Sequence, residues 1–393
     1  TLSYKGGPSN FNAKFALRTD KGILSGDAKL DLRPADMLYD VTLNTSKLDL
    51  ELFASIPTNL NSKIKISGEG FDPNKMKMDL VLDAGSSSIG DKLLNNLKIK
   101  AQAKDGLMIS SIYFSGDSTS ALINADVDFT NPDDPSYELK GSLNEVNLAR
   151  LMNNASLNSD INLTFDLTGQ GFNPDSLDLF LVTDIKDTRF ADFNVDSTRL
   201  ILDIRRNDNG NKIINLISDI ADFTISGDYK ISSLGNVFSR EAEILNKNIT
   251  DKYLAVFSDD ALYSQQLVLT ENQLPEELQD FSLTYLLDFK ESVEISLGEN
   301  YLELDGLISG NMSNKDEQLA IEMDSDFEYL KFWNDVDVYF LIDASVDFNL
   351  ENDLASLENN YLYSGFNVSA DRIYAGGNLY NLNADLDIND DKI

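Results

Sequence analysis

The stretch Ile161-Asn162-Leu163-Thr164-Phe165-Asp166-Leu167 alternates apolar and polar side chains without a break. Successive side chains of a β-strand point to opposite faces, so this pattern forms one apolar and one polar face. The alternation recurs along the chain, for example at residues 28–32 and 200–204, and turn-forming segments such as Asp72-Pro73-Asn74 lie between the alternating stretches. The sequence therefore predicts an all-β protein of short antiparallel strands, about five to eight residues each.

The composition excludes several classes of function. The 393 residues include 66 acidic and 32 basic side chains, so the formal net charge is −34, and neither His nor Cys occurs. Without His and Cys there is no Ser-His-Asp triad, no Cys nucleophile and no Cys/His zinc site. The acidic balance argues against a nucleic-acid partner, because binding phosphates needs a basic surface. No pair of acidic residues stands out as catalytic, and we predict a non-enzymatic protein without cofactor or metal.

An internal repeat of about one hundred residues organises the chain. Residues 67–73 (Ser-Gly-Glu-Gly-Phe-Asp-Pro) recur as residues 168–174 (Thr-Gly-Gln-Gly-Phe-Asn-Pro), with an offset of 171 − 70 = 101. A second signature occurs three times, at residues 24–30, 123–129 and 225–231. Such self-similarity indicates a unit that stacks on copies of itself. We predict one continuous repetitive segment over residues 1–393, with approximate repeats at 20–120, 121–224 and 225–393.

The repeat favours an extended antiparallel sheet over closed modules, because a sandwich or small barrel has no reason to repeat an open meander. Such a sheet would leave its apolar face in water unless it curls into a groove. One stretch departs from the alternation, since Phe238 to Val256 carry a helical stripe. We expect one or two short helices around residues 235–275, packed on the apolar face. The expected fold is an extended, curled antiparallel β-sheet, a taco-like groove with an apolar inner face.

Apolar residues that alternate within the first two repeats are expected to line this groove. They are Ile64, Ile66, Met76, Met78, Leu80, Leu163, Phe165, Leu167, Leu177, Leu179, Leu181, Leu200, Leu202 and Ile204.

These patterns resemble the repeat region of the AsmA-like and TamB (translocation and assembly module) superfamily of Gram-negative envelope proteins. The resemblance rests on strand signatures such as residues 225–231 (Ile-Ser-Gly-Asp-Tyr-Lys-Ile) and on segments of the type L-x-L-x-x-φ (φ, apolar) at residues 48–53 and, with Val in the first position, at residues 146–151. Residues 281–310 are similar to the middle of TamB-like proteins. The membrane anchor and the C-terminal domain of that family have no counterpart in these residues, so we expect the chain to be a fragment of a longer protein.

The resemblance implies a hydrophobic conduit that carries phospholipids across the periplasm between the inner and outer membranes and aids outer-membrane biogenesis. The implied partners are phospholipid acyl chains, the two membranes through regions outside this chain, and an outer-membrane assembly-type barrel protein. The implied location is the periplasm, with the full-length protein anchored in the inner membrane. An apolar groove fits this role, because acyl chains crossing water cost about 0.8 kcal/mol per exposed CH₂.

Two alternatives stay open at this point. One is a repetitive adhesin or scaffold made of dry β-sandwiches, and the other is an outer-membrane β-barrel. A barrel needs strands of about 9–11 residues with aromatic girdles, whereas the predicted strands are shorter and Trp333 is the single tryptophan. Solubility without detergent would separate the conduit from the barrel, and co-purified phospholipid would separate it from the sandwiches.

Overall fold

The computed structural model describes residues 1–51, 55–90, 92–116, 118–149, 154–190, 193–235, 237, 280–297, 300–316, 318–333, 338–353, 362–375 and 378–389. Its strands join in one open antiparallel sheet, which confirms the predicted all-β class. The sheet divides into two compact units. Unit 1 comprises Thr1–Phe172 and Leu177–Ile201, and unit 2 comprises Asn173–Ser176 and Leu202–Ile393.

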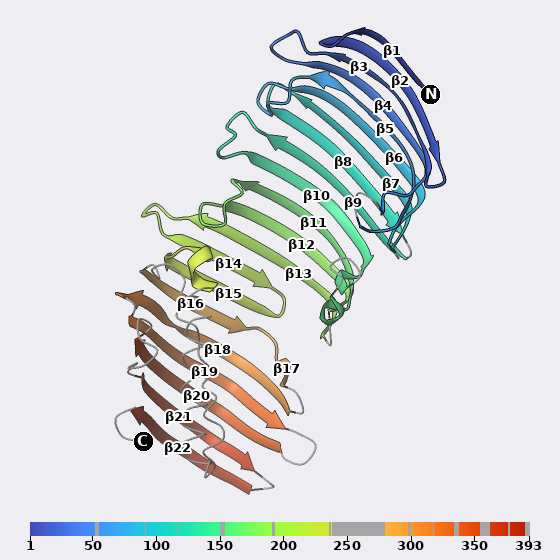
Figure 1. Ribbon diagram of the computed structural model, residues 1–393. Helices are drawn as coiled ribbons and strands as arrows, with labels where there is room; N and C mark the ends of the chain where they lie inside the picture. The colour runs from blue at the N-terminus through green and yellow to red at the C-terminus, as the bar shows by residue number, and fades with distance from the viewer. Residues whose placement is uncertain are drawn as a thin grey trace, which may run out of the picture. The chain divides into compact units, whose positions relative to one another are not determined.

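Twelve strands of unit 1 form a meander in which each strand pairs with the next along the chain. They are β1 (Leu2–Gly7), β2 (Asn10–Thr19), β3 (Gly22–Asp31), β4 (Leu38–Leu48), β5 (Thr58–Glu69), β6 (Lys77–Ile89), β7 (Lys92–Lys104), β8 (Leu107–Gly116), β9 (Thr119–Asp128), β10 (Ser136–Val146), β11 (Ser159–Gln170) and β12 (Asp178–Phe190), with the 3₁₀ helix η1 (Ala155–Leu157) before β11. Figure 1 shows these strands side by side and bent along their length, so the sheet of unit 1 is curled.

Strand β13 (Phe193–Arg206) contributes residues to both units. The strands of unit 2 that follow are β14 (Lys212–Ser218), β15 (Ala221–Asp228), β16 (Phe281–Phe289), β17 (Val293–Leu297), β18 (Asn300–Lys315), β19 (Gln318–Trp333), β20 (Val338–Asp353), β21 (Leu362–Ala375) and β22 (Asn378–Asn389). Both β16 and β17 pair with β18, each along a different part of it. From β18 to β22 each strand again pairs with the next.

The strands are longer than predicted. Most contain ten residues or more, and β18, β19 and β20 contain 16 each. The prediction of five to eight residues was wrong because apolar–polar alternation covers only the middle of a strand. Near the strand ends small polar residues occupy both faces, as Ser86, Ser87 and Ser88 do in β6.

Equivalent β-bulges shape one end of the strands in two repeats of unit 1. Asn61 of β5 accepts a hydrogen bond from the Lys47 N–H at 2.9 Å and donates one to the Ser86 carbonyl at 2.8 Å. Asn162 of β11 bonds the equivalent backbone positions of β10 and β12 at 2.8 and 3.0 Å. All four bonded residues have φ angles of 43° to 51°, a conformation that costs an L-residue about 1–2 kcal/mol. The asparagine amides offset this strain and hold the bulges in place.

A tyrosine crosses a glycine of the neighbouring strand at three places, six strands apart along the sheet order. The pairs are Tyr39 of β4 over Gly68 of β5, Tyr137 of β10 over Gly169 of β11, and Tyr285 of β16 over Gly310 of β18. In each pair a Cβ on the glycine would lie 2.6 Å from the tyrosine Oη, so the ring occupies the space of the missing side chain. The repeated signature at residues 24–30, 123–129 and 225–231 follows the same period, since it begins in β3, β9 and β15.

A short helical turn follows β15 in unit 2. Residues 231–235 and 237 are helical, whereas the predicted stripe from Phe238 to Val256 lies outside the described residues. Val237, only 1% exposed, packs with Tyr229, Leu283 and Met312 in a cluster of buried side chains. This turn therefore covers the apolar side of β16 and β18.

We expect Gly68→Ala to destabilise the fold by about 1–3 kcal/mol, because the added Cβ would collide with the Lys77 carbonyl and with the Tyr39 ring. Thermal unfolding followed by circular dichroism measures the effect. Gly7→Ala is the matched control, since a Cβ at Gly7 meets nothing within 4 Å. An unchanged Tm in Gly68→Ala would contradict the packing of the tyrosine over the glycine.

Candidate functional site

The strand register decides which side chains share a face of the sheet. In an antiparallel pair, residues directly opposite each other point to the same side. Ile66 of β5 lies opposite Val41 of β4 and Leu80 of β6, and Leu80 lies opposite Ala101 of β7. Following the pairings from β2 to β12 in this way assigns four positions of each strand to one side of unit 1.

We call this side the apolar face of unit 1. Its residues are Phe11, Ala13, Phe15 and Leu17; Leu24, Gly26, Ala28 and Leu30; Tyr39, Val41, Leu43 and Thr45; Ser62, Ile64, Ile66 and Gly68; Met78, Leu80, Leu82 and Ala84; Leu97, Ile99, Ala101 and Ala103; Met108, Ser110, Ile112 and Phe114; Ala121, Ile123, Ala125 and Val127; Tyr137, Leu139, Gly141 and Leu143; Leu163, Phe165, Leu167 and Gly169; Leu179, Leu181, Thr183 and Ile185. None of these side chains is charged, and the polar ones among them carry only hydroxyl groups.

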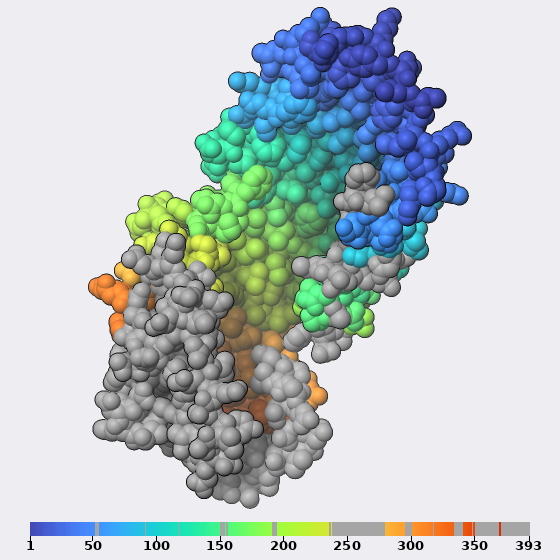
Figure 2. All heavy atoms as spheres, viewed as in Figure 1, coloured from blue at the N-terminus to red at the C-terminus, as the bar shows by residue number. Residues whose placement is uncertain are grey.

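Apart from Tyr39, which is buried, the large side chains of the apolar face are partly exposed. Along β6, Met78, Leu80 and Leu82 are partly buried while the residues between them are exposed, as on the concave side of a curled sheet. The buried members of the face include small residues such as Ala101 and Ala103. Both clusters of buried apolar side chains found in the described part of the chain lie in unit 2. Figure 2 shows the surface of unit 1 hollowed between the two ends of its strands.

The structure brings most of the residues predicted to line the groove onto this one face. Nine of them belong to it: Ile64, Ile66, Met78, Leu80, Leu163, Phe165, Leu167, Leu179 and Leu181. Met76 and Leu177 are partly buried but precede β6 and β12, in the segments that follow the Pro turns. Leu200, Leu202 and Ile204 alternate along β13, and Ile204 is buried at 9% exposure. Their role as lipid contacts stays a prediction.

Sequence reasoning missed the middle of the face. Ile99 of β7, Ile112 of β8 and Ile123 of β9 lie opposite one another in succession and form an unbroken row. The alternation of residues 97–103 carries the same signal as the stretch at 161–167 and could have identified this row. The small residues Ala101 and Ala103 could not have been chosen by hydrophobicity alone.

The opposite side of unit 1, its polar face, carries the charged side chains, which pair across neighbouring strands, together with exposed apolar residues such as Val81, Ile109 and Phe180. Lys14 and Asp27 lie directly opposite each other with Nζ and Oδ1 3.1 Å apart, and Lys140 pairs with Asp166 of the next strand at 3.2 Å. These side chains are more than half exposed, so each pair contributes at most about 1 kcal/mol. The polar face is a solvated surface.

In unit 2 hydrogen bonds fasten the helical turn and the segment Asn173–Ser176 to the sheet. Lys212 of β14, which is 3% exposed, donates a hydrogen bond to the Pro174 carbonyl. Both carboxylate oxygens of Asp175 accept hydrogen bonds from Ser232, from its N–H at 3.0 Å and from its hydroxyl at 2.6 Å. Ser232 lies in the first turn of the helical segment, so Asp175 holds that turn in place.

A cavity of about 370 Å³ in unit 2 is lined by acidic side chains, including Asp305, Asp326 and Asp343, beside Phe327 and Ala344. No group of three or more acidic residues in the described part of the chain is placed to hold a metal ion. The described acidic side chains of this cavity therefore do not converge on a common point, as the oxygen ligands of a metal ion must.

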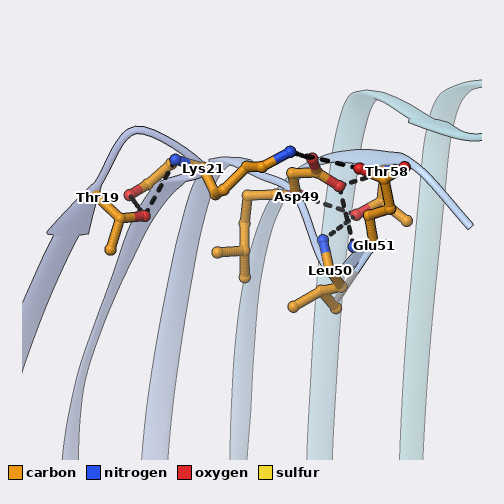
Figure 3. A network of polar contacts seen from close by, with 8 residues as sticks. Thr19, Lys21, Asp49, Leu50, Glu51 and Thr58 are labelled. Atoms are coloured by element: carbon orange, nitrogen blue, oxygen red, sulfur yellow. Dashed lines mark hydrogen bonds and ion pairs between the residues drawn. The ribbon is translucent and has the colours of Figure 1, made fainter. Parts of the chain in front are cut away.

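A polar network joins the turn between β2 and β3 to the residues between β4 and β5 (Figure 3). Lys21, in the turn between β2 and β3, pairs with Asp49 at 2.8 Å and with Glu51 at 3.3 Å. The other oxygen of Asp49 accepts hydrogen bonds from the Glu51 and Thr58 N–H groups at 3.0 and 3.1 Å. The hydrogen bond from Lys21 and those from the two N–H groups lower the pKa of Asp49 to about 2.

Comparison of the chain with models of protein families, with curated proteins and with solved structures gave no match. Within the described ranges, no helix has both the length and the apolar character that crossing a lipid bilayer demands.

Acid should weaken the network around Asp49. Its pKa is about 2 in the folded protein and 3.8 ordinarily, so its stabilising contribution is complete above the ordinary value and is lost as the pH falls towards 2. We expect Asp49→Asn to lower the Tm at neutral pH, and the difference from the wild type to shrink between about pH 4 and pH 2. Thermal unfolding at a series of pH values measures this convergence.

Asp20→Asn is the control, because Asp20 is a neighbouring exposed aspartate outside the network. It should show no such convergence. A Tm difference for Asp49→Asn that stays constant from neutral to acidic pH would count against the lowered pKa of Asp49.

Proposed function

We propose that this chain is a segment of a non-enzymatic conduit, which carries phospholipids by holding their acyl chains against the apolar face of unit 1. The observation that carries the proposal is the continuity of that face. Eleven consecutive strands, β2 to β12, each place four uncharged positions on the same side. Its large side chains other than Tyr39 remain partly exposed, so they can contact a ligand.

Acyl chains are the ligand that such a surface fits best. Burying a CH₂ group gains about 0.8 kcal/mol, so shielding a chain of roughly sixteen carbons gains on the order of 10 kcal/mol. A charged side chain along the path would oppose this gain, because a charge pressed against hydrocarbon loses its hydration. The face has no charged side chain, while charged residues such as Lys21 and Asp49 lie at the strand ends, where head groups would stay in water.

The proposal includes a setting and partners. We place the conduit in the periplasm, between the inner and outer membranes, where it would supply phospholipid for outer-membrane biogenesis. It would reach both membranes through regions outside this chain, and an outer-membrane assembly-type barrel protein would be a partner. The support for this setting is the similarity of the strand signatures, such as residues 225–231, to AsmA-like and TamB proteins.

The alternative of dry β-sandwiches predicts a second sheet packed on the apolar face. The described strands of unit 1 pair edge to edge in a single meander. A sandwich core would also bury side chains such as Leu80 and Leu167, which are only partly buried. We therefore favour a ligand over a second protein layer as the occupant of the face.

We expect Leu80→Asp and Leu179→Asp to reduce bound phospholipid about tenfold, equal to roughly 1.4 kcal/mol of binding free energy. The aspartate would place an unpaired charge against the acyl chain. The measurement is native mass spectrometry of the purified chain after incubation with phosphatidylethanolamine, together with phosphate analysis of the bound lipid.

Val81→Asp and Phe180→Asp are the matched controls. Each lies next to its test residue, but on the opposite face, and each wild-type side chain is 46% exposed. The controls should bind as much lipid as the wild type. Equal lipid binding by all four folded variants, or no lipid bound to the wild type, would rule out the proposed conduit.

A further inference from the structure

Two stacked aromatic pairs occupy one end of the strands of unit 1. Phe71 follows β5 and stacks on Tyr39, with ring centroids 5.0 Å apart and an interplanar angle of 5°. Phe172 follows β11 and stacks on Tyr137, at 5.2 Å and 9°. The tyrosines belong to the apolar face, so each phenylalanine extends that face beyond the strand end. The two stacked pairs are six strands apart, roughly 29 Å along a flat sheet.

The local backbone places each phenylalanine. Gly70 and Gly171, directly before Phe71 and Phe172, have φ angles of +69° and +77°, which turn the chain as it leaves the strand. The Tyr137 hydroxyl donates a hydrogen bond to the Gly171 carbonyl at 3.1 Å, so the ring reaches towards this turn. The same sequence, Gly-x-Gly-Phe, thus builds the same aromatic stack in both repeats.

Both phenylalanines stay 64% exposed, although both stack on a tyrosine. Packing within the chain therefore uses only a minor part of their apolar surface. Turn positions tolerate polar residues, yet an exposed ring recurs at the same position of both repeats, so its large apolar surface is available for a contact outside the protein.

The third tyrosine–glycine pair has no such phenylalanine. Gly310 is followed by Asn311-Met312-Ser313, so Ser313 stands where the other two repeats have phenylalanine. Tyr285 instead packs against the buried cluster that contains Val237 and Leu283. The exposed phenylalanine thus occurs in two repeats of unit 1, whose described residues form no buried cluster. In unit 2, where the turn with Val237 packs on β16 and β18, a serine stands at the equivalent position.

We infer that Phe71 and Phe172 are lipid-contacting residues, which hold acyl chains at this end of the apolar face. The inference rests on the proposed function and deepens it, because it assigns hydrocarbon contacts to two turn residues outside the strands. The polar network of Lys21, Asp49 and Glu51 lies at the opposite strand ends. Acyl chains therefore extend to the aromatic end of the face.

Fluorescence quenching tests this assignment on the full chain. Trp333→Phe removes the single tryptophan and keeps a ring beside Tyr301. On that background, Phe71→Trp, Phe172→Trp and Phe180→Trp each introduce one reporter. The probe is phosphatidylethanolamine with brominated acyl chains, compared with the unbrominated lipid. Phe180 is the matched control, since it is an exposed phenylalanine of unit 1 on the polar side of β12.

We expect the brominated lipid to quench the emission of the Phe71→Trp and Phe172→Trp variants severalfold more than that of Phe180→Trp. Equal quenching in all three variants, or none in the first two while phosphate analysis shows bound lipid, would overturn the inference and leave the proposed function standing. Absence of bound lipid would overturn both. Circular dichroism checks the fold of each variant, and because the two test positions report independently, one misfolded variant still leaves the other as a test.

Discussion

The antiparallel register is the constraint on which the rest of this structure depends. Because directly opposite residues share a face, the placement of Ile66 against Val41 and Leu80 propagates from strand to strand. A slip of one residue in β5 would turn Lys63 and Lys65 onto the apolar face. On that partly buried face the two ammonium groups would lose part of their hydration, which favours the observed register, whereas the exposed ion pairs of the polar face contribute little energy.

Glycine and asparagine residues shape the two ends of the repeated strands. Gly68 and Gly169 leave room for Tyr39 and Tyr137 to lie across the sheet, and no other residue type would avoid the clash. At the other strand ends, Asn61 and Asn162 bind backbone groups of bulged residues that have positive φ angles. These devices recur at the repeat spacing, so the sequence repeat corresponds to a repeat in strand geometry.

The two units differ in how far protein covers the apolar side of their strands. In unit 1 the face remains partly exposed over eleven strands, and exposed aromatic rings follow two of them. In unit 2 the turn that contains Val237 packs on β16 and β18, and Asp175 holds that turn through Ser232. An open apolar surface therefore belongs to unit 1, which is why the proposed lipid contacts and their tests concentrate there.

The sequence by itself determined the strand character, the polarity of the two faces and the repeat, because side-chain alternation and turn residues are local properties. It also identified nine residues that share the apolar face, among them Ile66 and Leu167. Only the tertiary structure decided the strand lengths, the bulges and the position of Tyr39 over Gly68 and beneath Phe71. These features depend on which strands pair and in which register. Residues that are far apart in the chain determine that pairing jointly.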